Sequence, residues 1–167
     1  MHEYSKALLY HEKALSIKQK ILLENHSDLA ITYSNISLIF RCLGHYSKAF
    51  SSYEKLVDIH QKNLPSIQSD LAFSFRKIGL MYLEIRDNSN ACISFEKVLE
   101  IYQHILSPDD FEFADSYYNI GLVYQQMGDH INALIFFERA LNIMQHSSSE
   151  NHPSLQIFEE NIKSLKE

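Results

Sequence analysis

The sequence predicts an all-α protein, a solenoid of antiparallel helix pairs, and three observations support this fold class. The same pattern recurs every 42 residues without a gap, as the series Ile36, Ile78, Ile120 and Ile162 shows. Apolar residues within each period stand three and four positions apart, which is typical of amphipathic helices. The glycines and prolines also fall at fixed places of the period. A period between about 20 and 50 residues indicates stacked repeats, each of which contacts only its neighbours.

The period divides the chain into five segments. We expect the unpaired second helix of a repeat in residues 1–26, complete repeats in residues 27–68, 69–110 and 111–152, and a C-terminal capping helix in residues 153–167.

The first element is expected to be a helix over residues 3–22, whose apolar stripe includes Ala7, Leu8 and His11. Its register makes it the second helix of a pair whose first helix is missing. One apolar flank near Ala7 and His11 should therefore lie uncovered. Either the chain is a piece of a longer array, or another molecule covers that flank.

The first complete pair is expected over residues 28–43 and 46–64. The polar side chains of residues 25–28 can accept hydrogen bonds from the free N–H groups at the start of its first helix. Gly44 supplies the left-handed residue that commonly ends a helix, and Pro65 closes the pair.

The second pair is expected over residues 70–85 and 90–106, with Asn88 taking the left-handed conformation in the turn between them. Pro108 separates it from the third pair, over residues 113–127 and 130–144, which Gly128 divides. Residues 147–149, three serines, are then expected to interrupt the helical structure. Pro153 stands where the first turn of the last helix tolerates proline.

Two glycines stand inside predicted helices, although a glycine there costs about 1 kcal/mol relative to alanine. Gly79 and Gly121 share one repeat position, so we expect a packing reason, namely close approach of the paired helix at Ala91 and Ala133. The last helix instead has charged residues where a following helix would pack, which predicts the end of the stack. These residues are Glu159, Lys163 and Lys166.

Composition and motifs exclude several classes of function. The 15 lysines and arginines against 21 acidic residues give a net charge of -6, which argues against nucleic acid as the main partner. Cys42 and Cys92 form neither a redox motif nor a zinc pair, and no histidine motif for metal is present. No signal peptide and no apolar run of membrane-spanning length is found. We therefore expect a cytoplasmic, non-enzymatic protein without a cofactor and without membrane association.

The third repeat carries a resemblance to a known family. Tyr117-x2-Ile120-Gly121-x2-Tyr124 followed by Ala133-x3-Phe137 resembles the tetratricopeptide repeat pattern W-x2-L-G-x2-Y and A-x3-F. The long period is similar to the kinesin light chain and nephrocystin type of this repeat. The resemblance implies a right-handed superhelix whose first helices line a concave groove for peptides.

The resemblance also implies which residues face that groove. They are Ile31, Ser34, Asn35, Leu38 and Arg41 in the first repeat, Phe73, Arg76, Lys77, Leu80 and Glu84 in the second, Asp115, Tyr118, Asn119, Leu122 and Gln126 in the third, and Asn161 in the last helix.

The chemistry of this stripe fits a peptide ligand. Its asparagines can donate and accept hydrogen bonds with a peptide backbone, its leucines offer apolar area, and Arg76 and Lys77 would favour an acidic ligand. Leu38, Leu80 and Leu122 stand where carboxylate-clamping repeats of this family carry asparagine, which argues against recognition of a C-terminal carboxylate. A purely solvated polar face is the alternative interpretation.

We therefore expect a scaffold that binds extended peptide segments, as a cytosolic adaptor of kinesin light chain type. Two alternatives remain open. The chain could self-associate through residues 3–22, or it could be the repeat tail of a larger enzyme.

Overall fold

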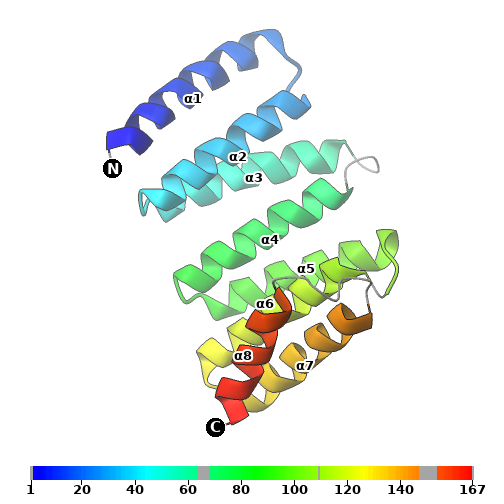
Figure 1. Cartoon of the computed structure of the whole chain (residues 1–167). Helices are drawn as coiled ribbons and strands as arrows, with labels where there is room; N and C mark the ends of the chain where they lie inside the picture. The colour runs from blue at the N-terminus through cyan, green and yellow to red at the C-terminus, as the bar shows by residue number, and fades with distance from the viewer. Residues whose placement is uncertain (1, 64–67, 109, 147–153, 167) are drawn as a thin grey trace. The chain divides into compact units, whose positions relative to one another are not determined.

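The computed structural model describes residues 2–63, 68–108, 110–146 and 154–166, and these residues form helices joined by short turns, without a strand among them. The all-α fold class predicted from the sequence is confirmed. The helices, shown in Figure 1, are α1 (His2–Ile21), α2 (Ser27–Cys42), α3 (Tyr46–Lys62), α4 (Gln68–Glu84), α5 (Asn88–Ile105), α6 (Phe111–Met127), α7 (His130–His146) and α8 (Ser154–Lys166).

Two compact units divide the chain, Met1–Ser74 and Phe75–Glu167, and the division falls inside α4. In the first unit, α1, α2 and α3 lie side by side and each runs opposite to the one before it (Figure 1). Buried residues of α2 recur at helical spacing, including Ile36, Ile39 and Phe40, and α3 buries Ala49 and Tyr53. Burying an aliphatic or aromatic side chain of this size contributes about 1.5 to 3 kcal/mol.

Helix α1 is covered on one side only. Its Ala7 and His11 are half-buried, and no side chain described in α1 is fully buried. Large apolar side chains of the helix stay exposed, among them Leu9, Tyr10 and Ile17. An uncovered apolar flank was predicted, and it lies at these residues and not at Ala7 and His11 themselves.

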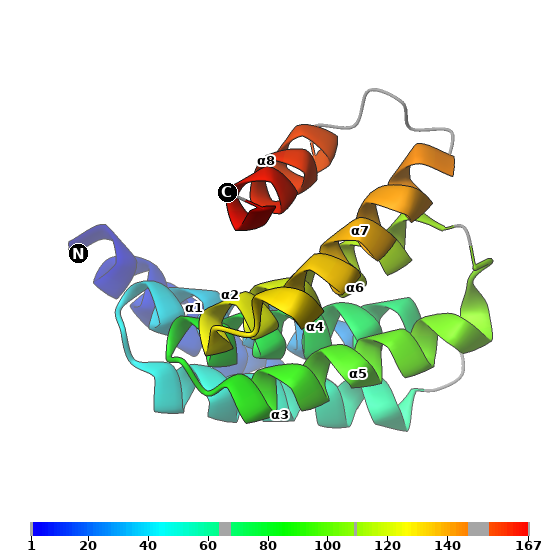
Figure 2. The ribbon, with the colours of Figure 1, turned by 90° about the horizontal axis from the view of Figure 1, so that it is seen from below.

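In the second unit, two apolar clusters join successive helices. Ala91 and Phe95 of α5 pack with Ile120 and Val123 of α6. Ala133 and Phe137 of α7 pack with Ile162 of α8, which lies beside α7 (Figure 2). The three charged residues expected to end the stack are exposed on α8, whereas its Phe158 and Ile162 are buried.

Both mid-helix glycines have a packing reason in the paired helix, and the atoms nearest to them belong to Phe95 and Phe137. A Cβ at Gly79 would lie 2.7 Å from the ring of Phe95, and one at Gly121 would lie 2.5 Å from the ring of Phe137. The groups that meet the glycines are therefore phenylalanine rings one helical turn beyond Ala91 and Ala133. A flat ring can lie directly on a backbone that has no side chain, so the larger residue makes the contact.

The turns follow the period, and this corrects one prediction. Gly44 and Gly128 have φ of 74° and 80°, as expected, and Arg86 is also left-handed, with φ of 61°. Asn88 is instead the first residue of α5, whose N-cap Asp87 accepts a hydrogen bond from the N–H of Asn90. Arg86 stands 42 residues from both glycines, so the repeat geometry fixes the conformation at that position whatever the side chain.

The predicted start of α2 is confirmed, because His26 caps it by accepting a hydrogen bond from the N–H of Asp28. The breaks expected at Pro65, at residues 147–149 and at Pro153 lie outside the described residues. None of the helices in the described ranges is both long enough and apolar enough to cross a lipid bilayer.

Candidate functional site

In the first unit, the predicted groove residues form a stripe along α2 that continues at the start of α4. On α2, Ile31 is 58% exposed and Leu38 46% exposed, Asn35 is also exposed, and Arg41 is half-buried. Phe73 of α4 is 41% exposed. Large apolar side chains that remain open to water on one stripe are the feature expected of a binding surface.

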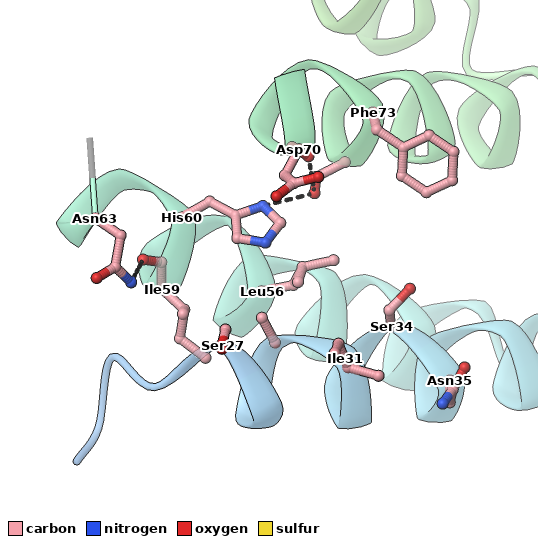
Figure 3. A pocket seen from close by; sticks show the side chains of 12 residues that line it. Ser27, Ile31, Ser34, Asn35, Leu56, Ile59, His60, Asn63, Asp70 and Phe73 are labelled. Atoms are coloured by element: carbon pink, nitrogen blue, oxygen red, sulfur yellow. Dashed lines mark hydrogen bonds between the residues drawn. The ribbon is translucent and has the colours of Figure 1, made fainter. Parts of the chain in front are cut away.

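Part of this stripe lines a cavity of about 360 Å³ that is open to solvent (Figure 3). Ile31, Ser34 and Asn35 of α2 and Phe73 of α4 line it, together with residues of α3 that the sequence analysis did not select. Leu38 and Arg41 are not among the lining residues. The structure therefore brings together Ser34, Asn35 and Phe73 around one depression whose size is typical of ligand pockets.

The α3 contribution to this cavity includes His60, which is only 9% exposed. Its Nδ1 lies 3.2 Å from the Ser74 hydroxyl, and that hydroxyl donates to the backbone carbonyl of Asp70 at 2.9 Å. Burial lowers the pKa of His60, while the charge and the backbone carbonyl of Asp70 oppose this shift. A nucleophilic serine needs a histidine that accepts its proton, whereas here the serine proton is directed to a carbonyl.

The same repeat position makes an equivalent contact elsewhere in the chain. In each case a polar residue near the end of one second helix contacts an acidic residue at the start of the next first helix, and Lys18 and His60 also contact a hydroxyl there. The sequence analysis missed this row, although a spacing of 42 residues marks it. Its members are Lys18 with Asp28 and Thr32, His60 with Asp70 and Ser74, and Tyr102 with Glu112, beside Ser116.

In the second unit, two predicted groove residues pair with each other. Arg76 Nη1 of α4 lies 3.1 Å from Asp115 Oδ2 of α6, and their side chains are 23% and 29% exposed. Asp115 thus already balances the charge of Arg76, and the expectation that Arg76 favours an acidic ligand stays a prediction. Of the other predicted residues on α4, Lys77 and Leu80 are half-buried and Glu84 is exposed.

Helix α8 covers part of the predicted surface on α6. Tyr118 stacks on Phe158 at a centroid distance of 4.3 Å, and Asn161 donates to the Tyr118 hydroxyl at 2.7 Å. Asn119 is 8% exposed, and Leu122 packs against the cluster that includes Ile162. Asn119 is thus buried, although an open amide was expected at this position.

One predicted residue of α6 remains open at the far end of that helix. Gln126 is exposed, and its side-chain amide donates to the Leu83 carbonyl at 3.2 Å. No group of His, Cys, Asp or Glu within the described ranges is arranged to hold a metal ion.

A family model described as tetratricopeptide repeat matches residues 1–62, 70–146 and 112–155 of the chain. No curated protein matches the sequence.

Among solved structures, the chain is similar to BtubC (BKLC) from P. vanneervenii, with a TM-score of 0.78 and 24% identity over 91% of this chain. It spans 60% of the length of that protein. It is also similar to the TPR-like repeats of a Podosopora anserina protein described as a kinesin light chain, with a TM-score of 0.80, 19% identity and coverage of 98% and 78% of the two chains. The N-terminal domain of the C. elegans stress-induced protein STI-1 matches with a TM-score of 0.61 and 18% identity, over 84% of this chain and 96% of that domain.

Proposed function

Because this chain belongs to the tetratricopeptide repeat family, whose repeats generally mediate protein–protein interaction, we propose that it binds an extended segment of a partner protein in the cavity between α2, α3 and the start of α4. Its role is that of a non-enzymatic adaptor of kinesin light chain type in the cytoplasm. The similarity of this chain to a solved structure described as a kinesin light chain supports the repeat type on which this proposal rests.

The cavity in the first unit is the observation that carries the proposal. Its apolar lining at Ile31 and Phe73 lies next to Ser34 and Asn35, which can bond to a peptide backbone (Figure 3). An extended peptide places alternate side chains on opposite faces, so it can insert one side chain and present its backbone groups to the asparagine. Apolar surface removed from water in this way contributes about 25 cal/mol per Å².

The test begins with an array of 15-residue peptides to select binders, whose Kd is then measured by fluorescence polarisation. Ile31→Glu and Phe73→Glu are each expected to weaken binding at least tenfold, because a charge would have to be buried against the ligand. The matched control is Ile135→Glu, since Ile135 is an exposed isoleucine of α7 in the other unit. Unchanged binding by both cavity variants, with melting temperatures like that of the control, would exclude the cavity as the binding site.

A second candidate function is self-association through α1, which the exposed Leu9, Tyr10 and Ile17 favour. Light scattering distinguishes a monomer from a dimer. A dimer that dissociates when Tyr10 is replaced by Glu supports self-association, and a monomer at high concentration contradicts it.

A further inference from the structure

A buried polar group faces the cavity proposed as the peptide site. His60 lines the cavity and is 9% exposed, and its ring points from α3 toward Asp70 of α4 (Figure 3). Its Nδ1 lies 3.2 Å from the Ser74 hydroxyl. The two ring nitrogens therefore have different surroundings. The Nδ1 edge lies against Ser74 and Asp70, and the Nε2 edge has no hydrogen-bond partner among the residues that the structure describes.

The surroundings of Nδ1 determine where the proton of the neutral ring resides. Ser74 has one hydroxyl proton, and it is donated to the Asp70 carbonyl at 2.9 Å. The Ser74 oxygen, 3.2 Å from Nδ1, is thus left as an acceptor for a proton on that nitrogen. A neutral histidine carries its proton on one nitrogen only, and the other nitrogen is an acceptor. With the proton on Nδ1, the nitrogen that remains for the cavity is an acceptor.

A cavity whose walls are largely apolar and in which a buried histidine offers an acceptor favours a particular side chain. Leu56 and Ile59 of α3 and Ile31 of α2 are aliphatic, and Phe73 adds an aromatic ring. A ligand side chain without a donor would displace water from this acceptor and leave it without a hydrogen bond. The site therefore discriminates against such side chains. Tyrosine combines a large apolar ring with a hydroxyl donor at its tip. When it enters the cavity, the hydroxyl reaches the buried acceptor and the ring contacts the apolar walls.

Resting on the proposed peptide-binding function, we propose that the cavity takes a tyrosine side chain of the partner and that His60 Nε2 accepts a hydrogen bond from its hydroxyl. His60 is thereby a specificity-determining residue, held in one tautomer by Ser74. The same repeat position carries Tyr102 and Met144 in the following repeats. A histidine acceptor at this position therefore occurs in the first unit and not in those repeats.

Two small probes test the proposal on the whole chain without knowledge of the partner. The probes are 4-fluorophenol and 4-fluoroanisole, in which a methyl group replaces the hydroxyl proton of the phenol. Binding is followed by 19F NMR titration. The phenol is expected to bind about 3 to 10 times more tightly, the equivalent of one hydrogen bond. In His60→Phe the two probes should bind equally.

The outcomes separate the two levels of the proposal. Equal binding of both probes to the wild-type chain would overturn tyrosine selection and leave the cavity as a peptide site. Binding of neither probe would overturn both. Selectivity for the phenol that persists in His60→Phe would assign the hydrogen bond to a residue other than His60.

A second measurement needs no substitution. The two nitrogens of His60 are distinguished by 15N NMR of histidine-labelled protein near pH 7.5, after assignment through the backbone. A proton on Nδ1 is expected. A proton on Nε2 would overturn the inference, because the ring would then present a donor to the cavity and the phenol oxygen would have to accept.

Discussion

Alanine at Gly121 is expected to destabilise the chain, although alanine is the better helix former. A Cβ at this position would lie 2.5 Å from Cδ1 and Cε1 of Phe137, whereas carbon atoms in contact are about 3.5 to 4.0 Å apart. The ring would have to move by about 1 Å. Phe137 is fully buried and packs with Ala133 and Ile162, so the space for this movement is small.

The magnitude follows from two opposing terms. Overpacking of a core costs about 1 to 3 kcal/mol, and the higher helix propensity of alanine offsets about 1 kcal/mol. Since the contact is far inside the normal distance, we expect a cost in the upper half of that range and a net loss of about 1 to 2 kcal/mol. For a chain of this length the melting temperature should fall by roughly 2 to 8 °C.

Urea unfolding followed by circular dichroism measures the change, and a double-mutant cycle identifies its cause. In the Phe137→Leu background the ring is absent, so Gly121→Ala should be neutral or stabilising by up to about 1 kcal/mol. The two substitutions are therefore expected to couple by about 1 to 3 kcal/mol. If Gly121→Ala stabilises the wild-type chain as much as it stabilises the Phe137→Leu variant, the ring does not lie on the glycine and the reasoning fails.

Three further predictions concern other parts of the chain. Arg86→Gly should stabilise it by roughly 0.5 to 1 kcal/mol, because Arg86 has φ of 61° where the equivalent turns have glycine; a loss in urea unfolding would show that the arginine side chain contributes more than the turn costs. Burial lowers the pKa of His60 from its ordinary 6.5, so its contribution to stability is fully present above that unfolded-state pKa and is lost as pH falls below it. The unfolding free energy of the wild type minus that of His60→Gln should therefore decrease from pH 7.5 to pH 5, and a constant difference would contradict the burial of the neutral ring. Arg76→Met and Asp115→Asn should each cost about 1 kcal/mol, because each breaks an ion pair whose side chains are only 23% and 29% exposed; the double variant should cost less than the sum, and strict additivity would mean that the two side chains do not interact.

Much of the local structure could be predicted from the sequence, because the signals for it are local. Apolar spacing within each period gives the helices, and residues such as His26 and Gly44 mark where helices begin and end. The period also places Arg86 on the glycine position of the turn. Asn88 was selected instead because its residue type suits a turn, which shows that repeat register is the stronger signal there.

The candidate site could be predicted only in part. Spacing along α2 selects Ser34 and Asn35, which line the cavity with Ile31, since residues three and four apart share a helix face. It cannot show that His60 of another helix closes the same cavity. Nor can it show that Phe158 of α8 stacks on Tyr118, or that Arg76 pairs with Asp115, because these contacts join residues about 40 positions apart in the chain.

The sequence by itself thus determined the repeat and the order of the helices, since these depend on periodicity along a single chain. The tertiary structure decided which atoms meet across helices: the ring of Phe137 on Gly121, the hydroxyl of Ser74 on His60, and the open cavity beside Phe73. Such contacts depend on distances of a few ångströms between separate helices, and a one-dimensional pattern does not contain those distances.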